Sequence, residues 1–204
     1  MQLIGMLDSP YVRRVAIALR LLGIDFEHRP LSVFRSFEQF AAINPVVKAP
    51  TLVCDDGTVL MDSSLILQYA QAVAPARRSL LPAAPEALCR ELHLSGLALA
   101  ACDRGVQIFY ERTLRPPEKH HEPWMARVRG QLGAAIAGLE VELSARPLAP
   151  SGAASSQAGV DVAVVWGFLQ RVLAETVVAA ASPALVAHAA AAEALPAFRA
   201  LPQT

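Results

Sequence analysis

The strongest constraint on the fold is a change in the sequence pattern near residue 75. Before it, short apolar segments typical of strands alternate with segments of helical periodicity, and after it the strand signals stop. Three prolines with small and basic residues occupy 75–85, a composition typical of a linker. We therefore expect two domains, at residues 1–75 and 86–204, joined by a linker at 76–85.

The first 75 residues predict a small mixed sheet covered by helices. Ser9 and Pro10 start a helix, Gly23 ends it, and Asp55-Asp56-Gly57 is a hairpin turn signal. In order, we expect a strand at 2–7, a helix at 10–22, a strand at 24–31, a short helix opened by a capping box at Ser36, strands at 51–54 and 59–61, and a helix from 62 to about 75. This is the order of a thioredoxin-like domain.

The rest of the chain predicts an all-helical domain. Apolar residues at helical spacing indicate a long helix ended by Pro116 and Pro117, followed by helices at 123–145, 160–180 and 184–195. Small residues at 146–159 predict a loop. The expected fold class is an α/β thioredoxin-like N-terminal domain plus an all-α C-terminal domain.

Charge and cysteine content exclude several classes of function. The chain has 18 basic and 18 acidic side chains, without the basic excess of a protein that binds nucleic acid or an anionic membrane. The uncharged segment 176–192 is alanine-rich, contains Pro183 and is too short to span a membrane. Three isolated cysteines predict neither a disulfide framework nor a metal site. With no secretory signal visible, we expect a cytoplasmic protein.

Three motifs in the first third of the chain resemble a known family. Ser9-Pro-Tyr-Val-Arg-Arg-Val15 resembles the S-P-F/Y-x-x-R/K-V signature of serine-type glutathione transferases, such as the tau class and its bacterial relatives. Asn44-Pro-Val-Val-Lys-Ala-Pro-Thr-Leu-Val53 resembles their N-P-x-x-K-V-P-x-L segment, and Asp62-Ser63 stands where they have Glu-Ser. The resemblance implies the glutathione-transferase fold over essentially the whole chain, with glutathione as co-substrate and no metal.

Ser9 is the catalytic residue that the resemblance implies. A thiol of pKa about 8.5 is only about 3% ionised near pH 7, and the thiolate is the nucleophile. A hydroxyl at a helix N-terminus can stabilise that thiolate by a hydrogen bond and by the helix dipole. The alternative is that Ser9 only caps its helix.

The resemblance also implies the residues that bind glutathione. A cis peptide bond at Pro50 would turn the Ala49 backbone toward the cysteinyl group, although an ordinary trans proline is the alternative. Ser63 would bind the γ-glutamyl carboxylate at a helix N-terminus, and Asp62 would face the ammonium. Lys48 would approach the glycyl carboxylate. Asp62 is shorter than the family's glutamate and is equally well explained as a plain helix cap.

Other residues match the family less closely. Asp161 resembles a buried structural aspartate of the helical domain, but its usual Ser or Thr partner is Ala158 here, with Ser155 or Ser156 as substitutes. Arg35 is a second basic residue near the glycyl end, and either it or Lys48 is equally a surface charge. Aromatic and long side chains at helical spacing could line the second-substrate pocket or belong to the core; they are Phe34, Ile108, Phe109, Arg112 and Trp166.

The expected function is conjugation or reduction of small apolar electrophiles by the glutathione thiolate. The alternative is a non-catalytic binding or regulatory module of the same fold, acting in stress response. A glutathione-dependent isomerase is disfavoured because the serine-serine-cysteine opening of zeta-type proteins is absent. The resemblance also implies a homodimer.

Overall fold

The computed structural model describes residues 1–75, 78–148 and 156–203. The chain divides into two compact units, each described by itself below. The first comprises Met1–Leu81 together with residues 194–203, and the second comprises Pro82–Glu193. The domain boundaries expected from the sequence stay a prediction, although the last residues of the chain group with the first unit.

The first unit contains a four-stranded mixed sheet. Strand order is β2-β1-β3-β4, with β1 parallel to β2, antiparallel to β3, and β3 antiparallel to β4. The strands are β1 (Gln2–Ile4), β2 (Glu27–Arg29), β3 (Thr51–Val53) and β4 (Val59–Met61). One parallel crossover and one hairpin thus occur where the sequence predicted them, which confirms the thioredoxin-like fold of this unit.

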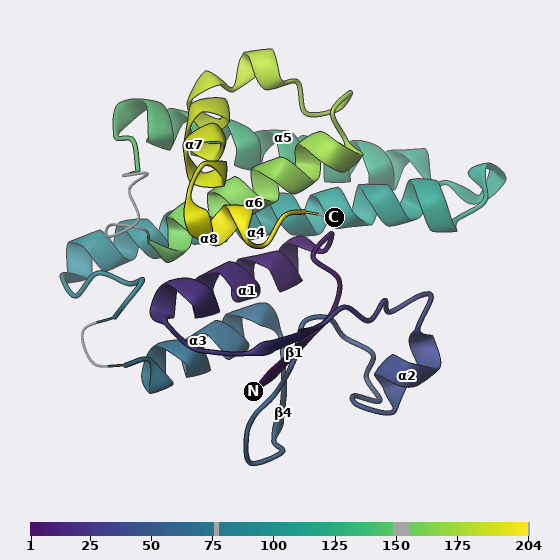
Figure 1. The fold of residues 1–204 in the computed structure, drawn as a ribbon. Coiled ribbons are helices and arrows are strands. Elements are labelled where there is room, and N and C mark those ends of the chain that lie inside the picture. The colour runs from purple at the N-terminus through teal and green to yellow at the C-terminus, as the bar shows by residue number, and fades with distance from the viewer. Residues whose placement is uncertain (76–77, 149–155, 204) are drawn as a thin grey trace. The chain divides into compact units, whose positions relative to one another are not determined.

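Helices α1 (Pro10–Leu22) and α3 (Ser63–Val73) pack against each other in this unit (Figure 1). Helix α1 has the predicted bounds because Ser9 caps it and Gly23 ends it in the left-handed conformation, φ 72°. The short helix α2 (Phe37–Ala41) has no side-chain cap at Ser36, so the predicted capping box is wrong. Ser32 instead accepts hydrogen bonds from two backbone N–H groups of the preceding turn.

Four longer helices form the second unit. Helix α4 packs on α5 and α6, and α7 packs on α5 and α6 (Figure 1). Their bounds are α4 (Pro85–Leu114), α5 (Glu122–Ala145), α6 (Gln157–Val172) and α7 (Pro183–Glu193), with short 3-10 helices η1 (Pro117–Lys119) and η2 (Ala179–Ala181). The predicted all-helical region is confirmed, and part of the predicted loop, 149–155, lies outside the described residues.

Helix α6 ends earlier than the sequence predicts. The helix expected at 160–180 stops at Val172, because Leu173 leaves the helical conformation and its carbonyl accepts the N–H groups of Thr176 and Val177. Leu173 and Val177 are both buried. Since the turn residues are as apolar as the helix, hydrophobic periodicity could not locate this end.

A final helix, α8 (Pro196–Arg199), was not predicted and packs on α1 in the first unit. The buried Arg13 of α1 donates from Nε to the carbonyl of Leu201 at 2.9 Å, and its guanidinium lies 5.6 Å from the centre of the Phe198 ring. A buried arginine thus ties the C-terminal segment to the first helix. None of the described helices is both long and apolar enough to cross a membrane.

Candidate functional site

Ser9 lies where β1 delivers the chain to the start of α1. Its Oγ accepts a hydrogen bond from the N–H of Val12 at 3.5 Å, a long contact, and the side chain is half-buried. Accepting this bond leaves the hydroxyl proton of Ser9 available for donation. The geometry therefore allows Ser9 to cap α1 and to donate to a ligand at the same time.

The loop before β3 contains the predicted cis peptide bond between Ala49 and Pro50. A buried network positions this loop: Asn44 Nδ2 donates to Thr51 Oγ1 at 2.8 Å, and Thr51 Oγ1 donates to the carbonyl of Lys48 at 2.7 Å. The side chains of Asn44 and Thr51 are buried and hydrogen-bonded to each other. They therefore hold the backbone of 48–50 in place and do not exchange these bonds with water.

Gly5 brings this loop close to the start of α1. Its φ is 138°, and a Cβ there would lie 2.6 Å from Cγ2 of Val12 and 3.3 Å from Cβ of Ala49. A side chain at residue 5 would therefore clash with α1. Glycine directly after β1 therefore permits Val12 and Ala49 to lie close to the backbone of residue 5.

Asp62 and Lys48 form an ion pair at the start of α3. Asp62 has φ 71° and caps the helix through Oδ1, which accepts the N–H of Ser64 at 2.9 Å, while Oδ2 lies 3.4 Å from Nζ of Lys48. Partial burial acts to raise the pKa of Asp62, but the Ser64 bond and the Lys48 ammonium outweigh it and leave that pKa below its ordinary value. Asp62 is therefore a carboxylate near neutral pH.

Ser63 begins α3 and is buried. Its Oγ accepts a hydrogen bond from a guanidinium nitrogen of Arg14 at 2.9 Å, and Oγ of Ser64 lies 3.3 Å from the same nitrogen. Arg14 is itself buried, so a positive charge lies beside the N-terminus of α3. The helix dipole and this guanidinium both favour an anion at Ser63.

Three local contacts link parts of the predicted site within the first unit. Val12 and Gly5 join Ser9 to Ala49, the Lys48–Asp62 pair joins the loop to α3, and Arg14 joins α1 to Ser63. Arg14 and the Asn44–Thr51 pair were missed as functional residues. Arg14 and Asn44 stand in the motifs themselves, but no local signal says that they are buried.

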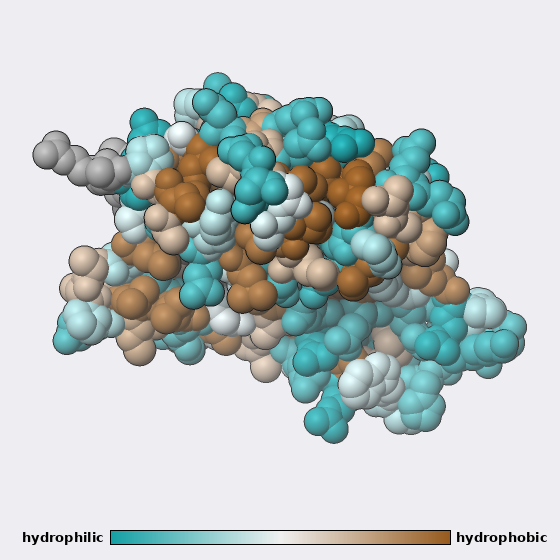
Figure 2. Space-filling model, turned by 90° about the horizontal axis from the view of Figure 1, so that it is seen from below, coloured by the Kyte–Doolittle hydropathy of each residue, from teal (hydrophilic) through white to brown (hydrophobic). Residues whose placement is uncertain are grey.

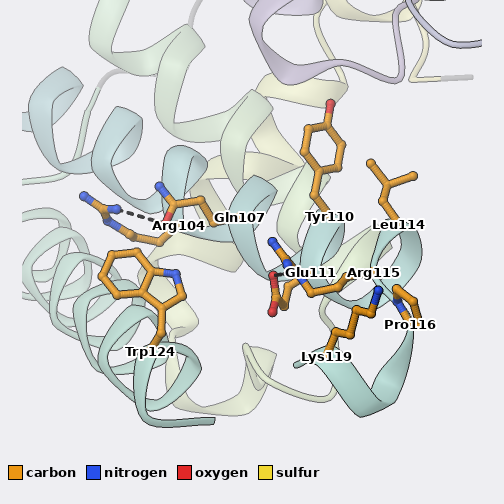
Figure 3. Close-up of a pocket in the computed structure, with 9 residues that line it drawn as sticks. All are labelled: Arg104, Gln107, Tyr110, Glu111, Leu114, Arg115, Pro116, Lys119 and Trp124. Carbon is orange, nitrogen blue, oxygen red and sulfur yellow. Dashed lines mark hydrogen bonds and ion pairs between the residues drawn. The ribbon is translucent and has the colours of Figure 1, made fainter. Parts of the chain in front are cut away.

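The residues expected around a second substrate are distributed over both units, and their role stays a prediction. Phe34 is exposed on the first unit, whereas Ile108 and Trp166 are buried in the second. Arg112 pairs with Glu175. The second unit has a pocket of about 650 Å³, whose lining includes Arg104, Gln107, Tyr110, Glu111 and Leu114 from α4 and Trp124 from α5 (Figure 3).

Asp161 has the structural position that the sequence predicted. It is fully buried in α6, and its Oδ1 accepts a hydrogen bond from Gln157 Nε2 at 2.7 Å. Ser156, one of the two substitutes considered, caps α6 by accepting the N–H of Gly159 at 3.1 Å. Residue 155 lies outside the described residues.

Within residues 1–75, 78–148 and 156–203, no group of three or more His, Cys, Asp and Glu side chains is placed to bind a metal ion. Cys54, Cys89 and Cys102 form no disulfide bond with one another.

Comparison with known proteins establishes the family. Residues 3–78 match the model of the glutathione S-transferase N-terminal domain. The GST-like protein YibF of Escherichia coli is 32% identical over 142 residues, covering 69% of this chain and 68% of YibF. The chain therefore belongs to the cytosolic glutathione-transferase superfamily, as its motifs predicted.

Solved structures show the same fold over nearly the full length. A glutathione transferase family member from Pseudomonas fluorescens Pf-5, with bound S-(propanoic acid)-glutathione, has a TM-score of 0.81 at 31% identity and 98% coverage of both chains. A glutathione S-transferase from Methylobacterium radiotolerans, in complex with glutathione sulfonate, has a TM-score of 0.89 at 28% identity, covering 100% of this chain and 95% of its own. Because these structural similarities cover nearly the full chain, the family assignment includes the helical unit.

Proposed function

We propose that this glutathione transferase activates the glutathione thiol through Ser9 and transfers the resulting thiolate to a small apolar electrophile. The observation that carries the proposal is the half-buried Ser9 hydroxyl at the start of α1, whose proton is free to donate. A hydrogen bond and the helix dipole lower the thiol pKa, and the released proton passes to solvent. The thiolate then bonds to the electrophilic carbon as the leaving group departs.

Ser63 and Arg14 are the proposed site for the γ-glutamyl carboxylate. The first-turn N–H groups of a helix have no intrahelical acceptor, and the guanidinium of the buried Arg14 lies beside them, bonded to Ser63. Ser63 Oγ accepts from Arg14, so its own proton can be donated to the carboxylate. The ionised Asp62 is available for the ammonium of the same group.

Lys48 and Ala49 are proposed to bind the rest of glutathione. The backbone of Ala49 precedes the cis bond and can pair with the cysteinyl amide as an added strand would. Lys48 is about half exposed and pairs with Asp62 across 3.4 Å. An exposed pair of this kind contributes little free energy, so both groups can turn to the charged ends of glutathione at small cost.

Two measurements test the proposal. Calorimetric titration of glutathione into wild type is expected to show binding that is lost in Ser63→Ala. With a panel of aryl halides and peroxides, Ser9→Ala is expected to lower kcat/KM by about 10- to 1,000-fold, as for a lost electrostatic donor. The matched control is Ser36→Ala, because Ser36 also precedes a helix but makes no side-chain cap.

Unchanged turnover in Ser9→Ala would refute the role of Ser9. Binding of glutathione without turnover on any electrophile would instead favour a non-catalytic module, the second function that the sequence allows.

We also propose that the chain forms a homodimer in the cytoplasm. Exposed large apolar side chains occur in both units, among them Leu65 and Val73 on α3 and Leu92 on α4, and apolar areas are visible on one face of the molecule (Figure 2). Such exposed apolar surface is typical of protein interfaces. Light scattering coupled to size exclusion is expected to give twice the chain mass, and a monomer would contradict the proposal.

A further inference from the structure

Arg13 is a charged residue at a core position of α1. It is 1% exposed, and the neighbouring residues of the helix, from Val12 to Leu19, are buried and mostly apolar. A buried guanidinium loses its hydration, which is costly unless protein groups accept its hydrogen bonds. An apolar side chain of similar length would fill this position without that cost. What arginine adds is a planar group whose hydrogen bonds have a defined direction.

The C-terminal segment, residues 194–203, provides two contacts for Arg13. Nε donates to the carbonyl of Leu201 at 2.9 Å, and the guanidinium lies 5.6 Å from the centre of the Phe198 ring. Leu201 and Phe198 are both buried, and α8 lies beside α1 (Figure 1). The N–H of Leu201 donates to the carbonyl of Phe198 at 3.1 Å, which closes the turn that presents the acceptor. The C-terminal segment is thus folded around the arginine.

Arg13 is also the residue that completes the first turn of α1. Its backbone N–H donates to the carbonyl of Ser9 at 3.0 Å. The side-chain bond of the same turn, from the N–H of Val12 to Ser9 Oγ, is long at 3.5 Å. The local cap therefore holds the Ser9 turn only weakly. Arg13, one helical turn further on, anchors this turn to the C-terminal segment.

From these contacts we propose that Arg13 is a positioning residue for the thiol chemistry. By bonding the C-terminal segment, it holds the first turn of α1, and with it the Ser9 hydroxyl, in the place from which Ser9 donates to the thiolate. The inference rests on the proposed function of Ser9. Catalysis depends steeply on such placement, since a displacement of about 1 Å can lower a rate about 100-fold. A residue that only stabilised the fold would leave the thiol of bound glutathione unchanged in every folded variant.

The test measures the pKa of the glutathione thiol in its complex with the full chain, from the ultraviolet absorbance of the thiolate as pH is raised. Arg13→Met fills the same space without directional donors. It is expected to raise this pKa by about one unit, an approximately tenfold loss in the ionisation constant. Calorimetric affinity for S-methylglutathione, which has no thiol to ionise, should change by less than about threefold. This pair of results separates a misplaced Ser9 from a general loss of the binding site.

Further variants approach the same contact from both sides. Arg13→Lys keeps a charged donor for a single carbonyl, so the thiol pKa should return part of the way to the wild-type value. Phe198→Leu should raise the thiol pKa, and it should add little to Arg13→Met because both changes break one contact. Arg20→Met is the matched control, since Arg20 lies on the same helix but is exposed. Glu91→Gln, in the second unit, controls for a general loss of stability, and both controls should keep the wild-type thiol pKa.

Ser9→Ala in the same titration separates this inference from the function on which it rests. A thiol pKa unchanged in Ser9→Ala would refute the role of Ser9 and, with it, that of Arg13. A thiol pKa raised in Ser9→Ala but equal to wild type in Arg13→Met and Phe198→Leu would overturn the inference about Arg13 alone. Circular dichroism checks that the variants fold, and if Arg13→Met does not, the same comparison is made with Arg13→Lys and Phe198→Leu.

Discussion

In the first unit, the starts of α1 and α3 are capped by neighbouring residues. In the second unit, α7 and α6, which also has a local cap at Ser156, receive carboxylates from other helices at their starts. Ser9 caps α1 and Asp62 caps α3, each within three residues in sequence. In the second unit, Glu91 of α4 accepts the N–H of Ala158 in α6 at 3.0 Å. Glu140 of α5 accepts the N–H groups that begin α7, at 2.9 and 3.0 Å.

The two units thus differ in how they provide hydrogen-bond acceptors for the first N–H groups of their helices. The first N–H groups of any helix lack acceptors, and a buried helix start without them is costly. The first unit supplies them by local turn chemistry at the starts of α1 and α3. The second unit adds acceptors from other helices at the starts of α6 and α7, which makes these caps part of the packing between helices.

The largest expected effect that would test the comparison is at Asp161. Asp161→Ala removes a fully buried acceptor and leaves the Gln157 amide unpaired, in a side chain whose Oε1 already lacks a partner. The free energy of unfolding should fall by about 3 kcal/mol, at the upper end for an unpaired buried group. Urea unfolding measures it, and a loss below about 1 kcal/mol would show that this part of the second unit does not depend on buried pairing.

Glu91→Gln is expected to have the next largest effect. The substitution keeps the shape of Glu91 but removes the negative charge at the start of α6, and the free energy of unfolding should fall by about 1–2 kcal/mol. Glu86→Gln, at an exposed position in the first turn of α4, is the control and should change it by less than about 0.5 kcal/mol. An equal loss of unfolding free energy in Glu91→Gln and Glu86→Gln would show that the carboxylate from α4 does not stabilise the start of α6.

Ser9→Ala should cost about 0.5–1 kcal/mol of stability, because its capping bond is long and can be replaced by water. Turnover of the same variant is expected to fall much more steeply than its stability, because Ser9 is the proposed hydrogen-bond donor to the glutathione thiolate. If Ser9→Ala lost more stability than Glu91→Gln, the local cap of α1 would be stronger than the long-range cap of α6. Paired urea unfolding of the two variants gives the ranking.

The smallest expected effect is a pH dependence at His188, which donates from Nε2 to the carbonyl of Gly159 at 2.9 Å in the neutral tautomer. Burial lowers the pKa of His188 below 6.5, and the Gly159 bond opposes this in part. As pH falls, His188 therefore binds a proton in the unfolded chain at a higher pH than in the folded protein. The contribution of His188 is complete above about pH 6.5 and is lost below it.

The histidine prediction is measured by urea unfolding at pH 7.5 and 5.5. Wild type should lose more stability between these pH values than His188→Gln, which keeps an N–H donor but does not titrate. An identical loss in both proteins would assign the pH dependence to other groups.

The sequence predicted helix bounds most accurately where residues close in sequence determine them. Helix α1 has the predicted bounds because Ser9, Pro10 and Gly23 act within one turn of its ends. The end of α6 at Val172 and the existence of α8 were missed, since buried turns and short apolar helices have no distinct pattern. The residues of the proposed site were predicted from motifs, whereas the buried positions of Arg14, Asn44 and Thr51 were not predicted.

The sequence by itself determined the strand and helix order of the first unit, the family, and the residues of the proposed glutathione site. The tertiary structure alone decided that Arg14 supports Ser63, that Arg13 ties the C-terminal segment to α1, and that Glu91 caps α6. These pairs lie 49, 188 and 67 residues apart. A cap or turn is fixed by adjacent residues, whereas a contact over such separations exists only after the chain has packed.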